Sequence, residues 1–446
     1  MRRGFSPSLP AAVWDKILED AFSVGGEAAC ARAACVCKDA ALAQEWRPRS
    51  NAVRVSPVSK KVWEPAAGHF DVTVPADDAH ALELALEACP LGGSMLLLPG
   101  THGRMLVTKP IHVFGRGQAT VHGIADYSLR STAPTATVDG VSFLGPPIPV
   151  APELPRLFSA VWICSGGMRV QSCVVTCSEG GIGIQIGAFI FGREDGLTEA
   201  EVRETVPVIQ DCEVHNCRIA AVGVGAASSW CVQRCRLHHN GSGVSVDAVN
   251  LRDHDFSFTP CEPKLLNNRI YHNRLGISVR GAFHTLYMEG NRVSNIVHVV
   301  LAGSKMVDNH FRTVCVDKGC CDMVDNRINK HMVYSDGATG RMEDCVVGGG
   351  VTIEGGARPT LVGNRVFGTT CIFGATTEGR IDHNALSTVA VCDGADPIVC
   401  HNTVKKTIMA NTLRGIFFGN TLLTAEMHAA FARGGVAVAP DDASLD

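Results

Sequence analysis

A three-part pattern of apolar and polar positions returns about every 17 to 23 residues along the C-terminal half of the chain. An apolar residue is followed three places later by Asn, and two places after that by a second apolar residue. The clear copies are Leu265–Asn268–Ile270, Met288–Asn291–Val293, Met306–Asn309–Phe311, Met323–Asn326–Ile328, Leu361–Asn364–Val366, Ile381–Asn384–Leu386, Val399–Asn402–Val404 and Phe417–Asn420–Leu422. In other copies Cys takes the Asn place, at Cys173, Cys212, Cys235 and Cys345. A fixed period of this length is typical of a solenoid, whose repeats cannot bury their apolar faces alone.

The repeat predicts stacked parallel strands rather than helices. Helical periodicity fails across these windows, and Gly at most repeat ends disfavours a helix. In a parallel stack the repeated residues lie one above another, roughly 4.8 Å apart. Inward Asn side chains at a turn can then bond to the coils above and below as a ladder. We therefore predict a mainly β fold, a right-handed parallel β-helix over residues 77–436 preceded by a small α-helical module.

Both ends of the predicted β-helix carry signs of a cap. Asp77 or Asp78 can begin a short helix whose apolar residues fall on one face: Leu82, Ala85, Leu86 and Cys89. This helix and the following "LLLPGTH…PIHVFG" segment resemble the N-terminal cap of pectin-lyase-like β-helices. At the other end we expect a capping helix over 425–433 and an acidic tail over 437–446.

Residues 1–47 differ in kind from the repeat. Two short apolar stripes, in "LPAAVWDKILEDAF" and "ACARAACVCKDAALA", flank Gly25-Gly26. The segment resembles an F-box, the helical module that docks adaptor proteins onto Skp1; it departs from that family at Ala40, where many members carry Trp. The resemblance implies partner contacts through Leu9, Pro10, Val13, Trp14, Ile17, Leu18, Val36 and Cys37.

The order of modules, with a linker over residues 48–76, resembles F-box proteins that carry carbohydrate-binding and sugar-hydrolase-type repeats. That resemblance implies a substrate-recruiting adaptor of an SCF-type (Skp1–cullin–F-box) ubiquitin ligase. Its F-box would dock a Skp1-like adaptor of a cullin–RING ligase, and its β-helix would bind a protein substrate. Two alternatives stay open: a polysaccharide-acting pectin-lyase-like enzyme, and a stand-alone carbohydrate- or protein-binding solenoid whose N-terminus only caps it.

Composition limits the remaining classes. A net charge of −4 and a pI near 6.5 disfavour a general nucleic-acid or membrane-surface role. The nineteen cysteines lack the double CxxC spacing of zinc sites, and no signal peptide is visible, so we expect buried, reduced thiols and a cytoplasmic or nuclear location. We expect no metal, no cofactor and no membrane partner.

No catalytic constellation is recognisable in the sequence. Glycosidases need two carboxylates about 5–10 Å apart, and the polygalacturonase motifs are missing. Asp308, Asp325 and Asp344 form a column just before the ladder position, which we interpret as a solvated, salt-bridged edge. Histidines near coil turns, such as His215, are expected to be surface hydrogen-bonding residues. We therefore predict no catalytic residues and a non-enzymatic function.

The position just after the ladder is rich in arginine. It should point outward, because it lies between two inward residues, and like charges stacked one coil apart repel by roughly 1 kcal/mol even in water. We predict that four arginines form a patch that binds an acidic or phosphorylated segment of the substrate, since guanidinium groups suit that task. They are Arg234, Arg236, Arg269 and Arg292.

Overall fold

The computed structural model describes residues 70–76, 80–123, 127–146, 158–177, 181–187, 206–225, 229–247, 263–281, 285–410, 415–422 and 438–439. The chain divides into two compact units between Phe311 and Arg312. We call the described residues up to Phe311 the first unit and those from Arg312 the second unit. The predicted F-box-like module, capping helix 425–433 and acidic tail lie outside the described residues, as do Asp77 and Asp78.

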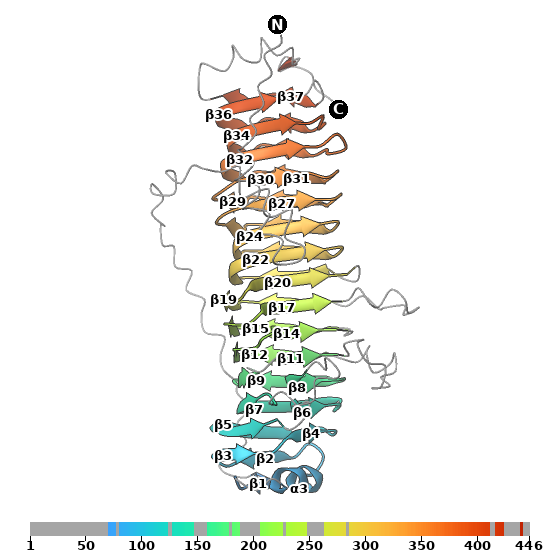
Figure 1. The fold of residues 1–446 in the computed structure, drawn as a ribbon, viewed down its shortest axis with the longest axis vertical. Helices are drawn as coiled ribbons and strands as arrows, with labels where there is room; N and C mark the ends of the chain where they lie inside the picture. The colour runs from blue at the N-terminus through green and yellow to red at the C-terminus, as the bar shows by residue number, and fades with distance from the viewer. Residues whose placement is uncertain are drawn as a thin grey trace, which may run out of the picture. The chain divides into compact units, whose positions relative to one another are not determined.

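The first unit is a stack of coils whose short strands form three parallel sheets, named A, B and C by their order along a coil (Figure 1). Sheet A contains β1 (Val72–Val74), β2 (Ser94–Leu97), β9 (Gly167–Gln171), β12 (Val208–Gln210), β15 (Cys231–Gln233), β18 (Lys264–Leu266), β21 (Thr285–Glu289) and β23 (Gly303–Val307). Sheet B contains β3 (Gly100–His102), β10 (Val174–Thr176), β13 (Glu213–His215), β16 (Arg236–His238) and β19 (Arg269–Tyr271). Sheet C contains β4 (Met105–Val107), β6 (Tyr127–Ser131), β8 (Ser159–Ile163), β11 (Ile182–Ile186), β14 (Ala220–Val224), β17 (Ser242–Asp247) and β20 (Leu275–Arg280). Longer strands span two sheets: β5 (His112–His122), β7 (Thr135–Leu144) and β22 (Arg292–Val300).

The second unit repeats this arrangement. Its sheet A contains β25 (Cys320–Val324), β28 (Thr339–Glu343), β31 (Arg358–Val362), β33 (Arg380–Asp382), β35 (Ile398–Cys400), β37 (Ile416–Phe418) and β39 (Val438–Ala439). Its sheet B contains β26 (Arg327–Ile328), β29 (Val346–Val347) and β38 (Thr421–Leu422), and its sheet C contains β27 (Met332–Ser335) and β30 (Val351–Ile353). The long strands are β24 (His310–Asp317), β32 (Arg365–Phe373), β34 (Ala385–Cys392) and β36 (Thr403–Ala410). The fold is therefore mainly β, a right-handed parallel β-helix, as the repeat predicts.

The apolar positions of the repeat fill the interior of each coil. Val232 pairs in register with Leu265, and Leu265 with Met288, and all three side chains are fully buried. In the second unit Leu361 pairs with Ile381, which pairs with Val399, again with no exposed area. Identical positions thus stack coil on coil, so each coil buries its apolar surface mainly against the next.

The predicted asparagine ladder is present at the corner between sheets A and B. In the first unit Asn268 Nδ2 donates to Asn291 Oδ1 at 2.9 Å, and Asn291 Nδ2 donates to Asn309 Oδ1 at 2.9 Å. In the second unit the same bonds link Asn364, Asn384, Asn402 and Asn420. Cys takes a rung as predicted: the backbone N–H of Cys235 donates to Asn268 Oδ1 at 2.9 Å. The ladder satisfies polar groups at a buried corner, where unpaired groups are costly.

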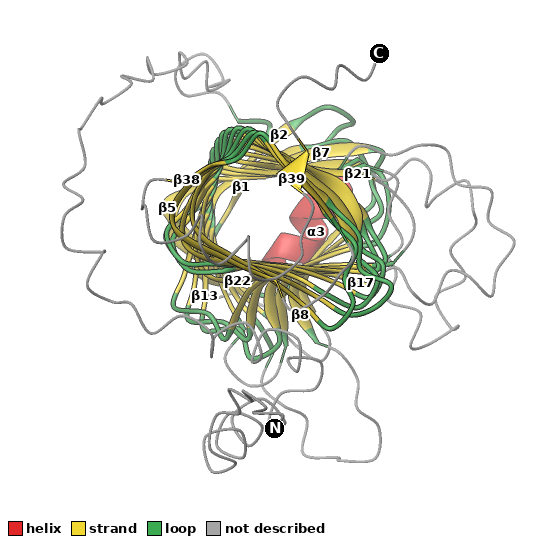
Figure 2. Cartoon of the chain, turned by 90° about the horizontal axis from the view of Figure 1, so that it is seen from above, coloured by secondary structure: helices red, strands yellow, loops and turns green. Residues whose placement is uncertain are grey.

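The N-terminal end of the first unit is closed by one short helix, α3 (Ala81–Ala88). The helix lies across the end of the coils (Figure 2). It contacts β1 and β4 and buries Leu82, Ala85 and Leu86, the face that the sequence predicts. Its N-cap is His80, without a side-chain capping bond. Strand β1 lies inside the range 48–76 that the sequence predicts as a linker. Val72–Val74 pairs in parallel with Met95–Leu97, so this part of the predicted linker belongs to the first coil. Among the described residues, no helix is long and apolar enough to cross a membrane.

Candidate functional site

Three exposed arginines form a column on the outer face of sheet B in the first unit. Arg236 pairs in register with Arg269, and Arg269 with Arg292. Each follows a buried ladder residue and precedes a buried apolar one, as Arg236 does between Cys235 and Leu237, so its side chain points to solvent. We call Arg236, Arg269 and Arg292 the arginine column. The structure gives none of the three guanidinium groups an ion pair to a described residue.

Arg234 lies apart from this column. It occupies the left-handed corner between sheets A and B, with φ of 53°. Its Nε and one terminal nitrogen each donate to a carboxylate oxygen of Asp211, both at 2.8 Å. Of the four predicted arginines, three thus lie in register. The fourth, Arg234, is neutralised at the neighbouring corner, because its guanidinium group binds one carboxylate through two hydrogen bonds.

The predicted aspartate column occupies the same corner. Asp308 in the first unit and Asp325 and Asp344 in the second all have positive φ, between 50° and 55°. Asp tolerates this left-handed conformation better than most residues, which gives a backbone reason for its recurrence. All three residues are exposed, which agrees with the solvated part of the prediction, but no ion pair to another described residue supports the salt-bridged part.

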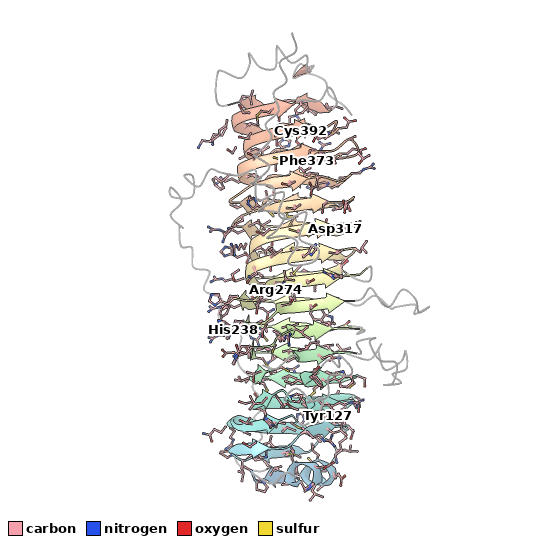
Figure 3. All side chains as sticks on the ribbon, viewed as in Figure 1. Tyr127, His238, Arg274, Asp317, Phe373 and Cys392 are labelled. Atoms are coloured by element: carbon pink, nitrogen blue, oxygen red, sulfur yellow. The ribbon has the colours of Figure 1, made fainter. Side chains whose placement is uncertain are left out.

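Aromatic rings stack beside the arginine column, two residues further along sheet B. His215 stacks on His238 with centroids 5.2 Å apart, and His238 stacks on Tyr271 at 4.9 Å. We call these three residues the ring column; His238 lies on the outer side of the coils (Figure 3). Sequence reasoning missed this feature, although the repeat carries the signal, since all three residues occupy the same place after their ladder residues.

Glu213 links the two columns. It pairs in register with Arg236, but its Oε1 lies 2.9 Å from Nε2 of His238. This hydrogen bond is the main cause that lowers the pKa of Glu213, and the charge of Arg236 acts in the same direction. Burial lowers the pKa of His215, with a contribution from His238, so His215 favours its neutral form. The arrangement offers the three positive charges of the arginine column beside the neutral imidazole of His215 and the phenol of Tyr271.

A second polar cluster surrounds Asp382 in the second unit. One terminal nitrogen of Arg380 donates to Asp382 Oδ2 at 2.7 Å. The Nδ1 atoms of His383 and His401 lie 2.6 Å and 3.2 Å from Oδ1. Burial favours the neutral carboxyl, but the bonds from Arg380, His401 and Cys400 outweigh it and hold the pKa of Asp382 far below its usual range. Burial, and after it the bond to Asp382, raises the pKa of Cys400 to about 11.

The ladder cysteines behave as small buried side chains, as predicted. Cys173, Cys212, Cys235 and Cys345 are free and buried. Each thiol donates to the backbone carbonyl two residues earlier, at 3.0 to 3.3 Å. Burial raises the pKa of Cys345 to about 11, so this thiol stays protonated and unreactive near neutral pH.

Comparison with known proteins agrees with the architecture. Residues 159–316 match the family model described as "Right handed beta helix region". A search of curated proteins gave no match.

Among solved structures, the A-module of the mannuronan C-5 epimerase AlgE6 of Azotobacter vinelandii is 14% identical, with 77% of this chain and 94% of that one covered and a TM-score of 0.33. A mutant DFA-IIIase of Arthrobacter chlorophenolicus A6, in complex with DFA-III, is 13% identical over 79% of this chain and 80% of that one, with a TM-score of 0.22. Similarities this low carry no information about substrate or chemistry.

Proposed function

We propose that the β-helix is a ligand-binding scaffold and that the arginine column is its anion-binding surface. The observation that carries this proposal is a contrast among exposed arginines. Arg234, Arg341 and Arg380 each bond to a carboxylate at 2.7 to 2.9 Å. The arginine column keeps three positive charges in register that no carboxylate of the described residues pairs, although their mutual repulsion favours pairing. A bound anion would offset that repulsion.

The ligand that fits this column is a chain with several closely spaced negative groups. Neighbouring coils lie about 4.8 Å apart, so the column presents one guanidinium at each such step. We propose an acidic or phosphorylated segment of a protein substrate, because guanidinium groups bind carboxylates and phosphates through paired hydrogen bonds.

The N-terminal sequence supports an adaptor function around this surface. The F-box resemblance of residues 9–38 belongs to the sequence, and those residues lie outside the described part of the chain. We propose that this segment docks Skp1 and that the β-helix recruits the substrate of an SCF-type ubiquitin ligase in the cytoplasm or nucleus.

Titration calorimetry of the full chain with Skp1 tests the adaptor proposal. We expect a dissociation constant in the micromolar range or below, and loss of binding in a Leu9→Ala/Pro10→Ala variant. A Leu84→Ala variant is a suitable control, since Leu84 is an exposed leucine on α3. Failure of the wild-type chain to bind Skp1 would refute the adaptor.

A separate titration tests the arginine column. The probes are a phosphorylated acidic peptide and its unphosphorylated form, and the variant is Arg269→Glu/Arg292→Glu. Arg358→Glu/Arg365→Glu is the matched control: it makes the same change in net charge, and Arg365 pairs in register with Val346 and Ala385 rather than with another arginine. We expect the first variant to weaken binding at least tenfold and the control to leave it within about twofold. If both variants weakened peptide binding equally, binding would depend on net charge rather than on the arginine column.

An acidic polysaccharide is the second candidate ligand, as a bound partner or as the substrate of a polysaccharide-acting enzyme. The ring column supports it, because His215, His238 and Tyr271 place aromatic rings and hydrogen-bonding groups directly beside the arginines. Incubation with polygalacturonate and alginate oligosaccharides, followed by product analysis, separates these cases. Turnover that is lost in a His215→Ala variant would favour the enzyme, and binding without turnover would favour a carbohydrate-binding solenoid.

A further inference from the structure

We propose that Asp382, His383 and His401 form a binding site for a divalent transition-metal ion, with Zn²⁺ as the reference ion. The site lies in the second unit and is independent of the arginine column. Imidazole nitrogen and carboxylate oxygen are common zinc ligands, and three protein ligands with an open fourth position is a familiar zinc arrangement.

The ligand atoms already converge. One atom from each residue lies within 4.8 Å of the other two. Both Nδ1 atoms approach the same oxygen, Asp382 Oδ1, at 2.6 Å from His383 and 3.2 Å from His401. Zinc bonds of 2.0 to 2.1 Å in a tetrahedron place ligand atoms about 3.4 Å apart. The nitrogen–oxygen separations must therefore open by less than about 1 Å to admit the ion.

The backbone of the stacked coils sets the positions of Asp382, His383 and His401. Asp382 ends β33 and pairs in register with Cys400 of β35, so His383 and His401 occupy the same corner of consecutive coils. Both histidines have left-handed backbones, with φ of 53° and 51°. Their rings stack with centroids 4.8 Å apart. A ligand set built on stacked strands is held more precisely than one on free loops.

Arg380 prepares the carboxylate to act as a ligand. It binds Oδ2 through Nε at 3.2 Å and a terminal nitrogen at 2.7 Å, which leaves Oδ1 directed at the histidines. Such outer partners orient metal ligands and typically change metal affinity by 10- to 100-fold. The ligand set of one carboxylate and two imidazoles resembles the zinc sites built from two histidines and one carboxylate, and Arg380 offsets its single negative charge from the outer side.

Exposure of the site leaves a position for solvent. The side chain of Asp382 is 10% exposed, whereas those of His383 and His401 are 65% and 43% exposed. The carboxylate therefore anchors the site from inside, and the imidazoles close it from the solvent side. An ion bound there can take water as its fourth ligand.

Titration of the full chain with Zn²⁺ under reducing conditions, followed by Co²⁺ spectroscopy, tests this site. We expect one equivalent bound at pH 7.5 with a dissociation constant in the micromolar range or below. Asp382→Asn and His401→Gln should each weaken binding at least 100-fold, and Arg380→Gln about 10- to 100-fold. Bound Co²⁺ should show visible bands of a four-coordinate site without thiolate charge-transfer absorption, which distinguishes this site from the cysteines.

His239→Ala/His272→Ala is the matched control. These two histidines also lie one coil apart with left-handed backbones, but their rings meet edge-on with centroids at 5.2 Å, and they lack the converging carboxylate. The control should bind Zn²⁺ like wild type. Absence of stoichiometric binding by the wild-type chain would overturn the site, as would equal binding by wild type and a folded His383→Ala/His401→Ala variant.

Discussion

At the scale of single residues, Asn and Cys occupy the same corner for different reasons. The amide of Asn291 donates to the carbonyl oxygens of Leu265 and Glu289 at 2.7 and 3.1 Å, and to Asn309 Oδ1 at 2.9 Å. A thiol makes fewer and weaker bonds, but it fits the space without leaving a large buried polar group unpaired. Cys345, for example, accepts the backbone N–H of Asn326 at 3.4 Å.

Replacing Asn291 tests this difference. Asn291→Ala leaves the N–H of Asn268 and the carbonyl of Leu265 without partners inside the coil, which should cost about 2–4 kcal/mol in the free energy of unfolding. Asn291→Cys should cost clearly less, since thiols hold this corner elsewhere. Urea denaturation of both variants measures the difference; equal losses would contradict the ladder argument.

Half-buried histidines make the free energy of unfolding depend on pH. Burial lowers the pKa of His298, and the charge of Arg280 lowers it further. The unfolded chain, with a histidine pKa near 6.5, then binds more protons than the folded chain, so stability is complete above about pH 6.5 and falls as the pH drops below it. His331 and His215 are shifted in the same direction.

We expect the urea midpoint to fall between pH 7.5 and pH 5.5, and to fall less in a His298→Gln variant. Each such histidine contributes at most about 1.4 kcal/mol per pH unit. His239→Gln serves as the control, because its side chain is exposed. A variant with an unchanged pH dependence would exclude His298 as a source of the effect.

At the scale of elements, the corners decide how strands follow one another. Gly290 has a φ of 64°, and a Cβ added there would collide with Oδ1 of Asn267 on the preceding coil. Gly337 also has positive φ, at 80°, but a Cβ there meets nothing within 4 Å. Comparing the two glycines therefore separates the cost of a left-handed backbone from the cost of crowding the Asn267 side chain.

Gly337→Ala should lower the free energy of unfolding by about 1–2 kcal/mol, the cost of a left-handed non-glycine residue. Gly290→Ala should lower it by a similar amount, because the contacted atom is the end of the exposed Asn267 side chain, which can rotate away. Thermal and urea denaturation of the two variants give the comparison. A loss for Gly290→Ala well above that for Gly337→Ala would show instead that the Asn267 side chain cannot move aside.

The elements also show what sequence could and could not predict. The ladder and the registers of the arginine column follow from spacing alone, because the repeat fixes which residues stack. The bond between Glu213 and His238 joins positions two residues apart on successive coils, so it depends on side-chain conformation, which spacing does not specify. The cluster around Asp382 depends in the same way on two corner histidines turning toward one oxygen. Strand β1 falls in the predicted linker because a strand of three residues is too short to show a repeating pattern of apolar positions.

At the scale of the whole molecule, stability is distributed along each unit rather than concentrated in one core. Leu361 of the second unit contacts the coils before and after it through the pairings of β28 with β31 and β31 with β33. A coil weakened at such a position should affect its neighbours most, since coils of a solenoid interact mainly with adjacent coils.

Leu361→Ala should lower stability by about 2–5 kcal/mol, because it removes a fully buried side chain. Hydrogen exchange should show the largest loss of protection in β28, β31 and β33, with smaller changes in the described coils of the first unit. A uniform loss of protection across all strands would indicate a single cooperative unit instead.

The direction of the inter-coil hydrogen bonds also determines how the protein would respond to force. In each unit these bonds point along the stacking axis, so tension on the ends of a unit loads every interface between coils in series. The outermost coil, which is bonded to a neighbour on one side only, would detach first. Successive ladder asparagines lie 18 to 23 residues apart. Each detached coil would thus release about 60–80 Å of extended chain. A substrate held on one face would then be tethered by a scaffold that yields in regular increments rather than failing at once.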